Sequence, residues 1–391
     1  MRSIHSRHVV LGQTTFRGIE RDIRLCAPDR LKHVYVVGKT GTGKSTFLRQ
    51  IAEQDMKAGS GFAFIDPHGD VAIDLARAAS KRPGDRAVIL DCSGPTPTWS
   101  LNVFAGVAPA RRGLAAESIV DVFRKLWIDD WGPRLEHVLR AVVWTLLENP
   151  GTSFDDVPDL LTDRERRRAL TGHLENEVVR RFWTQEFERY SPAFRAVVTA
   201  PILNKVGAFL TNPTVRTIVS APRSSFDVRA LMDGGGVLIA NLAKGVLGES
   251  SSNLLGSLLV SLISQAALER ADTAFGARRD FMLYLDEFQS FTTLNLVLMF
   301  AELRKFRVGL VVAHQYFGQL EREILESVLA NAGTLVAFRP APDDAERLAW
   351  ALRRPGYAED LLALEPFHFS ARLSIEGEEP RALSGRVAVD F

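Results

Sequence analysis

The chain has 391 residues, enough for two or three domains of ordinary size. Its composition, 46% hydrophobic and 24% charged residues, is that of a globular protein and excludes a mainly disordered or fibrous chain. Lysine and arginine total 48 against 47 aspartates and glutamates, and the resulting net charge of +1 excludes the overall basic field of a histone-like protein. Any contact with nucleic acid must therefore be local.

Cysteine content and hydropathy bear on the compartment. The two cysteines, Cys26 and Cys92, lie far apart and support neither a disulfide framework nor a thiolate zinc site. The stretch MRSIHSRHVVLGQ at the N-terminus has no apolar run long enough for a signal peptide. The most apolar stretch, residues 254–267, is interrupted by glycine, serine and glutamine. We expect a cytoplasmic protein in which no segment spans a membrane.

Predicted strands and helices alternate along the first hundred residues. HVYVV at 33–37 predicts a strand that leads into the loop GKTGTGKST, and FLRQIAEQDMKAG predicts the helix that follows. GFAFIDP at 61–67 and AVILD at 87–91 predict two more strands, with an alanine-rich helix between them. This alternation is typical of a parallel sheet covered by helices on both faces.

The pattern changes to long helices between residues 104 and 220, as in LEHVLRAVVWTLLE. Alternation resumes with GVLIANL at 236–242. A helix at 249–271, the strand FMLYLDE, a helix at 294–305 and the strands VGLVVAHQ and GTLVAFR follow. We therefore expect an α/β nucleotide-binding domain in two parts, residues 1–104 and 222–391, separated by an all-α insertion at 105–221.

The glycine-rich loop after the first strand has the P-loop pattern G-x-x-x-x-G-K-[ST]. In such a loop, backbone N–H groups converge on phosphate oxygens, the lysine reaches the β- and γ-phosphates, and the hydroxyl binds Mg²⁺. A flexible glycine turn is the alternative, but the strand before and the helix after favour a phosphate site. The predicted ligands are ATP and Mg²⁺, held by Gly38, Lys39, Thr40, Gly41, Thr42, Gly43, Lys44, Ser45 and Thr46.

A P-loop hydrolase also needs a carboxylate for the metal and a base for water. Asp286 follows the apolar strand FMLYL and Glu287 comes next, so both belong at the carboxyl edge of the sheet. An acidic turn after a buried strand is the alternative, and the P-loop makes it the weaker one. We expect Ser45 and Asp286 to hold Mg²⁺ and Glu287 to activate water.

Two further side chains are candidates for the same reaction. Gln315 ends the strand VGLVVAHQ, where an amide can sense the γ-phosphate, whereas we expect the preceding His314 to be structural. Arg304 ends the helix after Glu287, too far away to reach the phosphates of its own subunit. It either serves a neighbouring subunit or belongs to a solvated Arg-Lys pair at a helix C-terminus.

Two turns at the same expected edge are ambiguous. The run Asp66-Pro67-His68-Gly69-Asp70 has metal-binding residue types, but a structural turn is the better interpretation because no second ligand cluster supports it. Lys244 follows Asn241 in a glycine- and serine-rich loop, which is either a contact to a phosphate backbone or a connector.

Taken in order, GKTGTGKST, FIDPHGD, NLAKG, LYLDEFQ, ELRKF and VVAHQ resemble the HerA/FtsK superfamily of P-loop DNA-pumping ATPases. The likeness is closest to the TraG/TraD-type conjugative coupling proteins of type IV secretion systems. It implies a RecA-like fold with an inserted all-α domain. It also implies a homohexameric ring that hydrolyses ATP at its subunit interfaces and moves DNA through a central channel. In that resemblance Gln315 is the phosphate-sensing glutamine and Arg304 the arginine that acts in trans.

The resemblance leaves more than one role open. Coupling proteins usually carry N-terminal transmembrane helices, and this sequence shows none. A partner that recruits the chain to the membrane, a relaxase or a nuclease would each fit. The alternatives are a secretion-associated ATPase that acts on protein substrates, a HerA-like ATPase that works with a nuclease, and a nucleotide-gated assembly module with little turnover. An intact Glu287 argues against the last of these.

Overall fold

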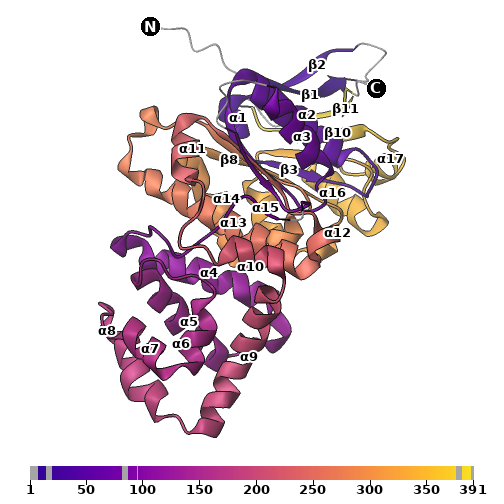
Figure 1. Ribbon diagram of the computed structural model, residues 1–391. Helices are drawn as coiled ribbons and strands as arrows, with labels where there is room; N and C mark the ends of the chain where they lie inside the picture. The colour runs from indigo at the N-terminus through magenta and orange to yellow at the C-terminus, as the bar shows by residue number, and fades with distance from the viewer. Residues whose placement is uncertain (1–7, 15–19, 82–86, 95, 376–380, 389–391) are drawn as a thin grey trace. The chain divides into compact units, whose positions relative to one another are not determined.

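The computed structural model describes residues 8–14, 20–81, 87–94, 96–375 and 381–388, so the first seven residues of the N-terminal stretch lie outside it. The chain divides into two compact units (Figure 1). The α/β unit comprises Met1–Ile89, Val228–Leu242 and Ala266–Phe391, and the helical unit comprises Leu90–Asp227 and Ala243–Gln265. The helical unit therefore takes in a segment after residue 242 that the predicted insertion at 105–221 does not contain.

The α/β unit is built on an eleven-stranded sheet with the order β2-β1-β11-β10-β9-β3-β8-β7-β4-β6-β5. The pairs from β9 through β3, β8, β7 and β4 to β6 are parallel, and those from β9 out to β2 are antiparallel. The predicted α/β fold with a mainly parallel central sheet is confirmed. The strands are β1 (His8–Thr14), β2 (Asp22–Cys26), β3 (Val34–Val37), β4 (Gly61–Asp66), β5 (Ala87–Asp91), β6 (Val237–Asn241), β7 (Phe281–Leu285), β8 (Val308–His314), β9 (Thr334–Ala337), β10 (His368–Leu373) and β11 (Arg381–Arg386).

Helices cover both faces of this sheet (Figure 1). On one face the apolar sides of α2 (Lys44–Ala58) and α3 (Asp70–Ser80) pack on alternate residues of the strands, such as Val34 and Val36 of β3. On the other side lie α14 (Leu294–Glu302), α15 (Arg322–Asn331) and α16 (Ala345–Ala351). The parallel strands are buried along their whole length, as continuous apolar runs such as FMLYL require. The unit also contains α1 (Ala27–Arg30), α11 (Val228–Gly234) and α17 (Ala358–Leu362).

The helical unit contains helices with apolar stripes at a period of three to four residues. Its longest helix is α9 (Pro192–Leu210), and α13 (Glu249–Glu269) belongs to this unit as far as Gln265. The others are α4 (Arg112–Leu126), α5 (Pro133–Glu148), α6 (Asp156–Thr162), α7 (Arg164–Thr171), α8 (Glu177–Arg181), α10 (Pro213–Val219) and α12 (Lys244–Leu247).

Two helices in the described part of the chain are long and apolar enough to cross a membrane by length and composition. They are Pro192–Leu210, whose 18-residue apolar window is 22% buried in the fold, and Glu249–Asp272, whose window is 78% buried. Buried core helices of soluble proteins have the same length and composition, so this finding is weak evidence for a membrane span.

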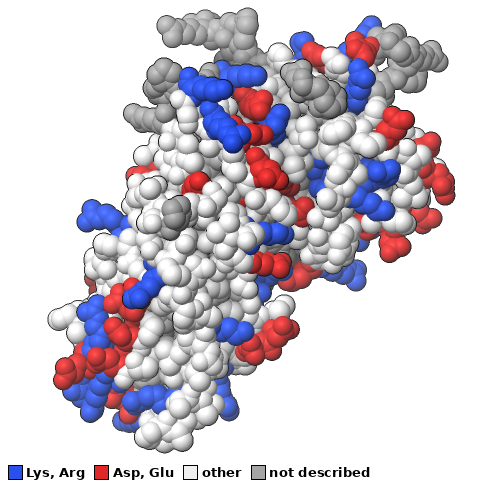
Figure 2. Space-filling model, turned by 45° about the vertical axis from the view of Figure 1, so that its right-hand side comes forward, with Lys and Arg blue, Asp and Glu red and all other residues white. Residues whose placement is uncertain are grey.

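Charges of both signs are interspersed on the visible face of the molecule (Figure 2). This mixture agrees with the net charge of +1. Contact with a polyanion on this face would depend on small groups of lysine and arginine.

His33, just before β3, is a buried neutral histidine of the α/β unit. Its Nδ1 accepts a hydrogen bond from the Leu310 N–H at 3.0 Å, and its Nε2 lies 3.0 Å from the Phe300 carbonyl oxygen. Because the Leu310 N–H can only donate, the ring must be the neutral Nε2–H tautomer. Burial, and to a smaller degree the charge of Arg304, lowers the pKa of His33 to about 4.

The stability of the α/β unit should therefore fall in mild acid. Between pH 6.5 and 4 the unfolded histidine binds a proton that the folded one does not, so the free energy of unfolding falls by up to about 1.4 kcal/mol per pH unit for this residue. In urea unfolding measured across this range, His33→Asn should flatten that dependence, and asparagine tolerates the left-handed backbone at φ 68°. An unchanged slope in the variant would contradict this role.

Candidate nucleotide site

The polar residues predicted to act on ATP meet at one edge of the parallel sheet. Gly38 follows β3, Asp286 follows β7, and Gln315 follows β8. Because β3 pairs with β8 and β8 with β7, all in parallel, the carboxyl ends of these three strands are neighbours. A ligand bound at this edge can be contacted by all three strands, as is usual for open α/β sheets.

The P-loop wraps the N-terminus of α2 and is anchored from several sides. The Gly38 N–H donates to the His314 carbonyl at 3.3 Å, and the Lys39 N–H donates to the Arg339 carbonyl at 2.9 Å. Gly43 caps the helix at φ 113°, and a Cβ there would lie 2.9 Å from the ring of Phe367. A side chain at this position would be strained and crowded, so the turn requires glycine.

Lys44 and Ser45 open α2 and face the strand that carries Asp286. Buried Lys44 donates from Nζ to the Lys39 carbonyl at 3.1 Å. Burial lowers the pKa of Lys44, against the opposing effect of Glu287 and Asp286. Ser45 Oγ donates to Asp286 Oδ2 at 2.7 Å. Burial raises the pKa of Asp286 to about 6, and the charge of a bound cation would lower it again.

Glu287 is held by amides on both carboxylate oxygens. Gln315 Nε2 donates to Oε1 at 3.1 Å, and Gln289 Nε2 donates to Oε2 at 2.6 Å. The backbone of Glu287 is left-handed at φ 47°, a conformation that is strained for a glutamate and that concentrates at functional sites. The structure therefore links Ser45, Asp286, Glu287 and Gln315 in one chain of contacts, and the ammonium of Lys44 is close enough to feel the charges of both carboxylates.

Gln289 also contacts Glu287, although the sequence pattern predicts no role for it. It stands inside the LYLDEFQ run, three positions after Asp286, and lies in a short 3-10 helix, Phe288–Phe291. The sequence shows a polar side chain close to the acidic pair, but the turn that folds Gln289 back onto Glu287 cannot be inferred from it.

The contacts of the Asp66 turn are those of a structural turn. The Asp66 carboxylate accepts hydrogen bonds from three backbone N–H groups, those of His68, Val71 and Ala72, at 2.9–3.1 Å. It thereby ties the end of β4 to the first turn of α3. A Cβ at Gly69, whose φ is 100°, would lie 2.2 Å from the Asn241 amide oxygen, so Asn241 fills the space above the turn. In the described part of the chain no group of three His, Cys, Asp or Glu side chains is arranged to hold a metal ion.

Arg304 is not part of this cluster. It lies in the 3-10 helix Leu303–Phe306, immediately before β8, and is exposed. It therefore lies at the amino end of the strand whose carboxyl end leads into Gln315. At about 3.3 Å per residue, the seven residues of β8 separate the two ends by roughly 20 Å. The arginine cannot contact phosphates held by the P-loop of its own chain.

His314, which we expect to be structural, is buried beneath the site. Its Nε2 lies 2.5 Å from the Tyr35 hydroxyl, and its ring stacks between Tyr35 and Phe317. Burial and, to a smaller degree, the nearby charge of Lys44 lower the pKa of His314 to about 3. A neutral aromatic layer therefore supports the backbone that leads into Gln315.

The donor set fits ATP and Mg²⁺. Ser45 Oγ and Asp286 Oδ2 are hard oxygen ligands already 2.7 Å apart, which suits a small cation bound through oxygen. A Cβ at Gly41 would meet no heavy atom within 4 Å, so the loop leaves open space in front of its backbone. The helix N-terminus and the buried ammonium of Lys44 supply the positive potential that phosphates need.

Comparison with known proteins also indicates a P-loop ATPase. Residues 11–102, which contain the P-loop, match the family described as "Helicase HerA, central domain". No curated protein matches the chain in sequence.

Three solved structures share the fold over most of the chain. The bacterial conjugative coupling protein TrwBdeltaN70, in an unbound form, has a TM-score of 0.64 at 16% identity, with 100% of this chain and 90% of that chain covered. TrwB in complex with ADPNP has a TM-score of 0.68 at 18% identity, covering 93% and 87%. VirB4 of Thermoanaerobacter pseudethanolicus has a TM-score of 0.66 at 14% identity, covering 98% and 96%. Together with the sequence match at residues 11–102, they confirm the predicted resemblance of this chain to the HerA/FtsK-type P-loop ATPases.

Proposed function

We propose that the protein is an ATP-driven DNA-translocating motor of the coupling-protein or HerA type, which hydrolyses ATP at the subunit interfaces of a homohexameric ring. One observation carries this proposal. The contact chain from Ser45 through Asp286 and Glu287 to Gln315 occupies one sheet edge, whereas the exposed Arg304 lies at the opposite edge. Such a division of groups suits a site completed by a second copy. The fold shared with TrwB, which has been solved with ADP and Mg²⁺, supports ATP as the ligand.

Each residue then has a distinct task. Backbone N–H groups from Gly38 to Thr46 and the Lys44 ammonium bind the phosphates, and Ser45 and Asp286 hold Mg²⁺. The metal, when bound, neutralises charge on the β- and γ-phosphate oxygens. Glu287 orients the attacking water and accepts its proton. Gln315 donates a hydrogen bond to Glu287 and senses the γ-phosphate, so it couples the position of that carboxylate to the presence of the γ-phosphate.

DNA should stimulate the reaction if the ring is a pump. We expect turnover to rise with single-stranded or duplex DNA and this increase to weaken from low to moderate salt, because phosphate contacts release counterions. Steady-state ATPase rates with no nucleic acid and with each form of DNA would measure this, with Glu287→Gln as the blank. Turnover that is indifferent to DNA would contradict the pump and favour the alternative, a secretion-associated ATPase that acts on protein substrates.

The role of Arg304 in trans can be tested by mixing. Arg304→Ala subunits retain an intact P-loop site, and Glu287→Gln subunits retain an intact arginine, so each variant alone should be inactive. If the two are combined before assembly, random mixing makes about a quarter of the interfaces complete. ATPase activity should then return. If the mixture remains inactive, Arg304 does not act across an interface.

The cellular role follows from the same resemblance. We place the protein in the cytoplasm, recruited to the inner face of the membrane by a secretion component or working with a relaxase or a nuclease. The helical unit, which includes the predicted insertion at 105–221, is then the surface available to such partners. Pull-down of the intact ring with candidate relaxases and nucleases would test this.

A further inference from the structure

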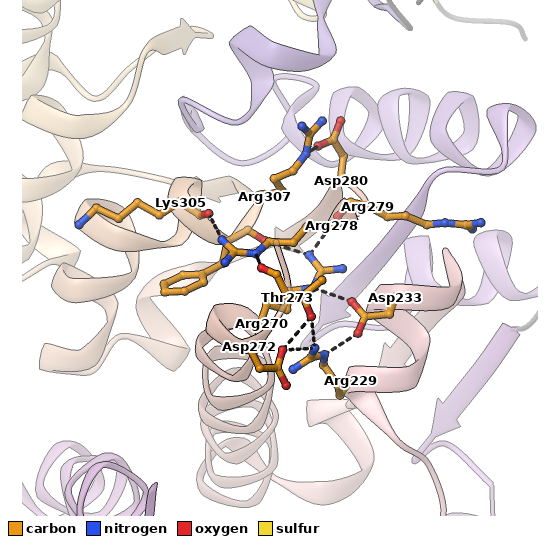
Figure 3. Close-up of polar contacts among 11 residues, drawn as sticks. Arg229, Asp233, Arg270, Asp272, Thr273, Arg278, Arg279, Asp280, Lys305 and Arg307 are labelled. Carbon is orange, nitrogen blue, oxygen red and sulfur yellow. Dashed lines mark hydrogen bonds and ion pairs between the residues drawn. The ribbon is translucent and has the colours of Figure 1, made fainter. Parts of the chain in front are cut away.

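The segment that carries Arg304, residues 303–307, is held by two other arginines through its backbone (Figure 3). Arg278 donates from Nη1 to the Lys305 carbonyl at 2.5 Å, and its guanidinium lies over the Phe306 ring, 5.3 Å from the centroid. Arg270 donates from Nη1 to the Phe306 carbonyl at 3.0 Å. Two consecutive carbonyl groups next to Arg304 are therefore fixed by guanidinium groups from elsewhere in the α/β unit.

Neighbouring contacts anchor the end of the segment. Arg307 donates from Nε to Asp280 Oδ1 at 2.6 Å, and its carbonyl accepts the Phe281 N–H at 3.0 Å. The segment is therefore fixed at the point where it leads into the buried strand β8. Arg304 differs from the residues around it because it is exposed and, within the described part of the chain, no carboxylate pairs with it. Lys305, by contrast, pairs with Glu302 at 2.6 Å.

Burial of the Arg270 guanidinium costs desolvation free energy, and its contacts explain why an arginine occupies this position. Its side chain has no exposed surface, and the ion pair that it forms among the described residues is with half-exposed Asp233, at 2.9 Å. Its Nη2 has no hydrogen-bond partner among the described residues. An apolar side chain of similar volume is often as stabilising as a buried ion, so stability alone does not account for this guanidinium. What it supplies is a donor to the Arg279 and Phe306 carbonyls, which joins two loops at the amino edge of the sheet.

We infer that Arg270 and Arg278 are positioning residues that clamp segment 303–307 so that Arg304 is presented to the nucleotide of a neighbouring copy. This inference rests on the proposed hydrolysis in trans. The physical reason is preorganisation: an arginine that stabilises a transition state is most effective when its backbone is fixed before the reaction, and small misplacements cost large factors in rate. Among the residues that the structure describes, neither clamp residue contacts the P-loop site of its own chain, so their loss should affect only the neighbour's reaction.

The mixing assay places the defect on one side of the interface. Arg278→Ala should lower kcat about tenfold or more with little change in the KM for ATP, because substrate binding stays intact. Addition of Glu287→Gln subunits, whose clamp is whole, should restore turnover to Arg278→Ala subunits. The double variant Arg278→Ala/Glu287→Gln should restore Arg304→Ala subunits about tenfold less than Glu287→Gln subunits do. Arg278→Lys, which keeps a charged donor, should recover part of the lost rate.

Matched variants keep the result interpretable. Arg229→Ala is the control, because Arg229 belongs to the same network through Asp233 and Asp272 but, in the described structure, makes no contact with segment 303–307 (Figure 3). It should leave turnover unchanged. Arg270→Met, which fills the same space without charge, should behave like Arg278→Ala. Wild-type kcat in both clamp variants, or a loss that Glu287→Gln subunits do not repair, would overturn the inference. If Arg304→Ala itself is not complemented, the proposed hydrolysis in trans fails and the inference fails with it.

Discussion

Glu287→Gln should abolish ATP hydrolysis while leaving ATP binding intact. The glutamine keeps the shape of the side chain but cannot accept a proton from water, and loss of a general base typically costs about 10²–10⁴-fold in rate. Hydrogen bonds from Gln315 and Gln289 preorganise this carboxylate for the reaction. Steady-state phosphate release would give kcat, and titration with a fluorescent ATP analogue would give the affinity.

Two variants would distinguish the loss of the general base from an unspecific loss of activity. Glu302→Gln removes a glutamate that pairs only with exposed Lys305 in the described part of the chain, and it should leave kcat nearly unchanged. Gln289→Ala removes one of the two amides on Glu287 and should reduce kcat by a smaller factor than Glu287→Gln. Near wild-type turnover in Glu287→Gln would show that another group activates the water.

Asp55→Ala should be the most damaging single change to the stability of the α/β unit. Asp55 of α2 binds Arg30 through two hydrogen bonds of 2.6 Å, and both side chains are almost fully buried. The Tyr284 hydroxyl, on the strand that leads into Asp286, donates to Asp55 and accepts from Arg30 at 2.7 Å. Removal of the aspartate leaves a buried guanidinium without its counter-ion, which costs about 3–5 kcal/mol. Urea unfolding would measure the loss as a lower midpoint.

The double variant Arg30→Met/Asp55→Ala tests whether the unpaired charge of Arg30 causes this loss of stability. Because it removes both charges, it should recover part of the stability lost in Asp55→Ala. Asp22→Ala breaks the exposed pair with Arg24 and should cost less than about 1 kcal/mol. If the double variant is less stable than Asp55→Ala, the cost lies in packing and not in the unpaired charge.

The P-loop and the acidic pair could be predicted from the sequence because each is local. GKTGTGKS lies between a strand and a helix that hydropathy alone reveals, and Asp286 and Glu287 directly follow an unbroken apolar run. The central parallel strands were predictable for the same reason, since strands buried on both faces are apolar throughout. The strands β1, β2, β10 and β11 were not predicted. Short runs such as DIRLC and RALSGR carry charges in the antiparallel part of the sheet, and their sequences resemble those of loops.

The sequence by itself determined that this chain binds a nucleoside triphosphate through a P-loop on an α/β sheet, because those features depend on spacing within a few residues. Only the tertiary structure decided which distant groups meet. The approach of Gln315 to Glu287 depends on β7 and β8 pairing in parallel, and the clamp on residues 303–307 depends on Arg270 and Arg278 reaching its carbonyl groups. Contacts of this kind join residues whose neighbours along the chain carry no trace of the partner, so no local pattern predicts them.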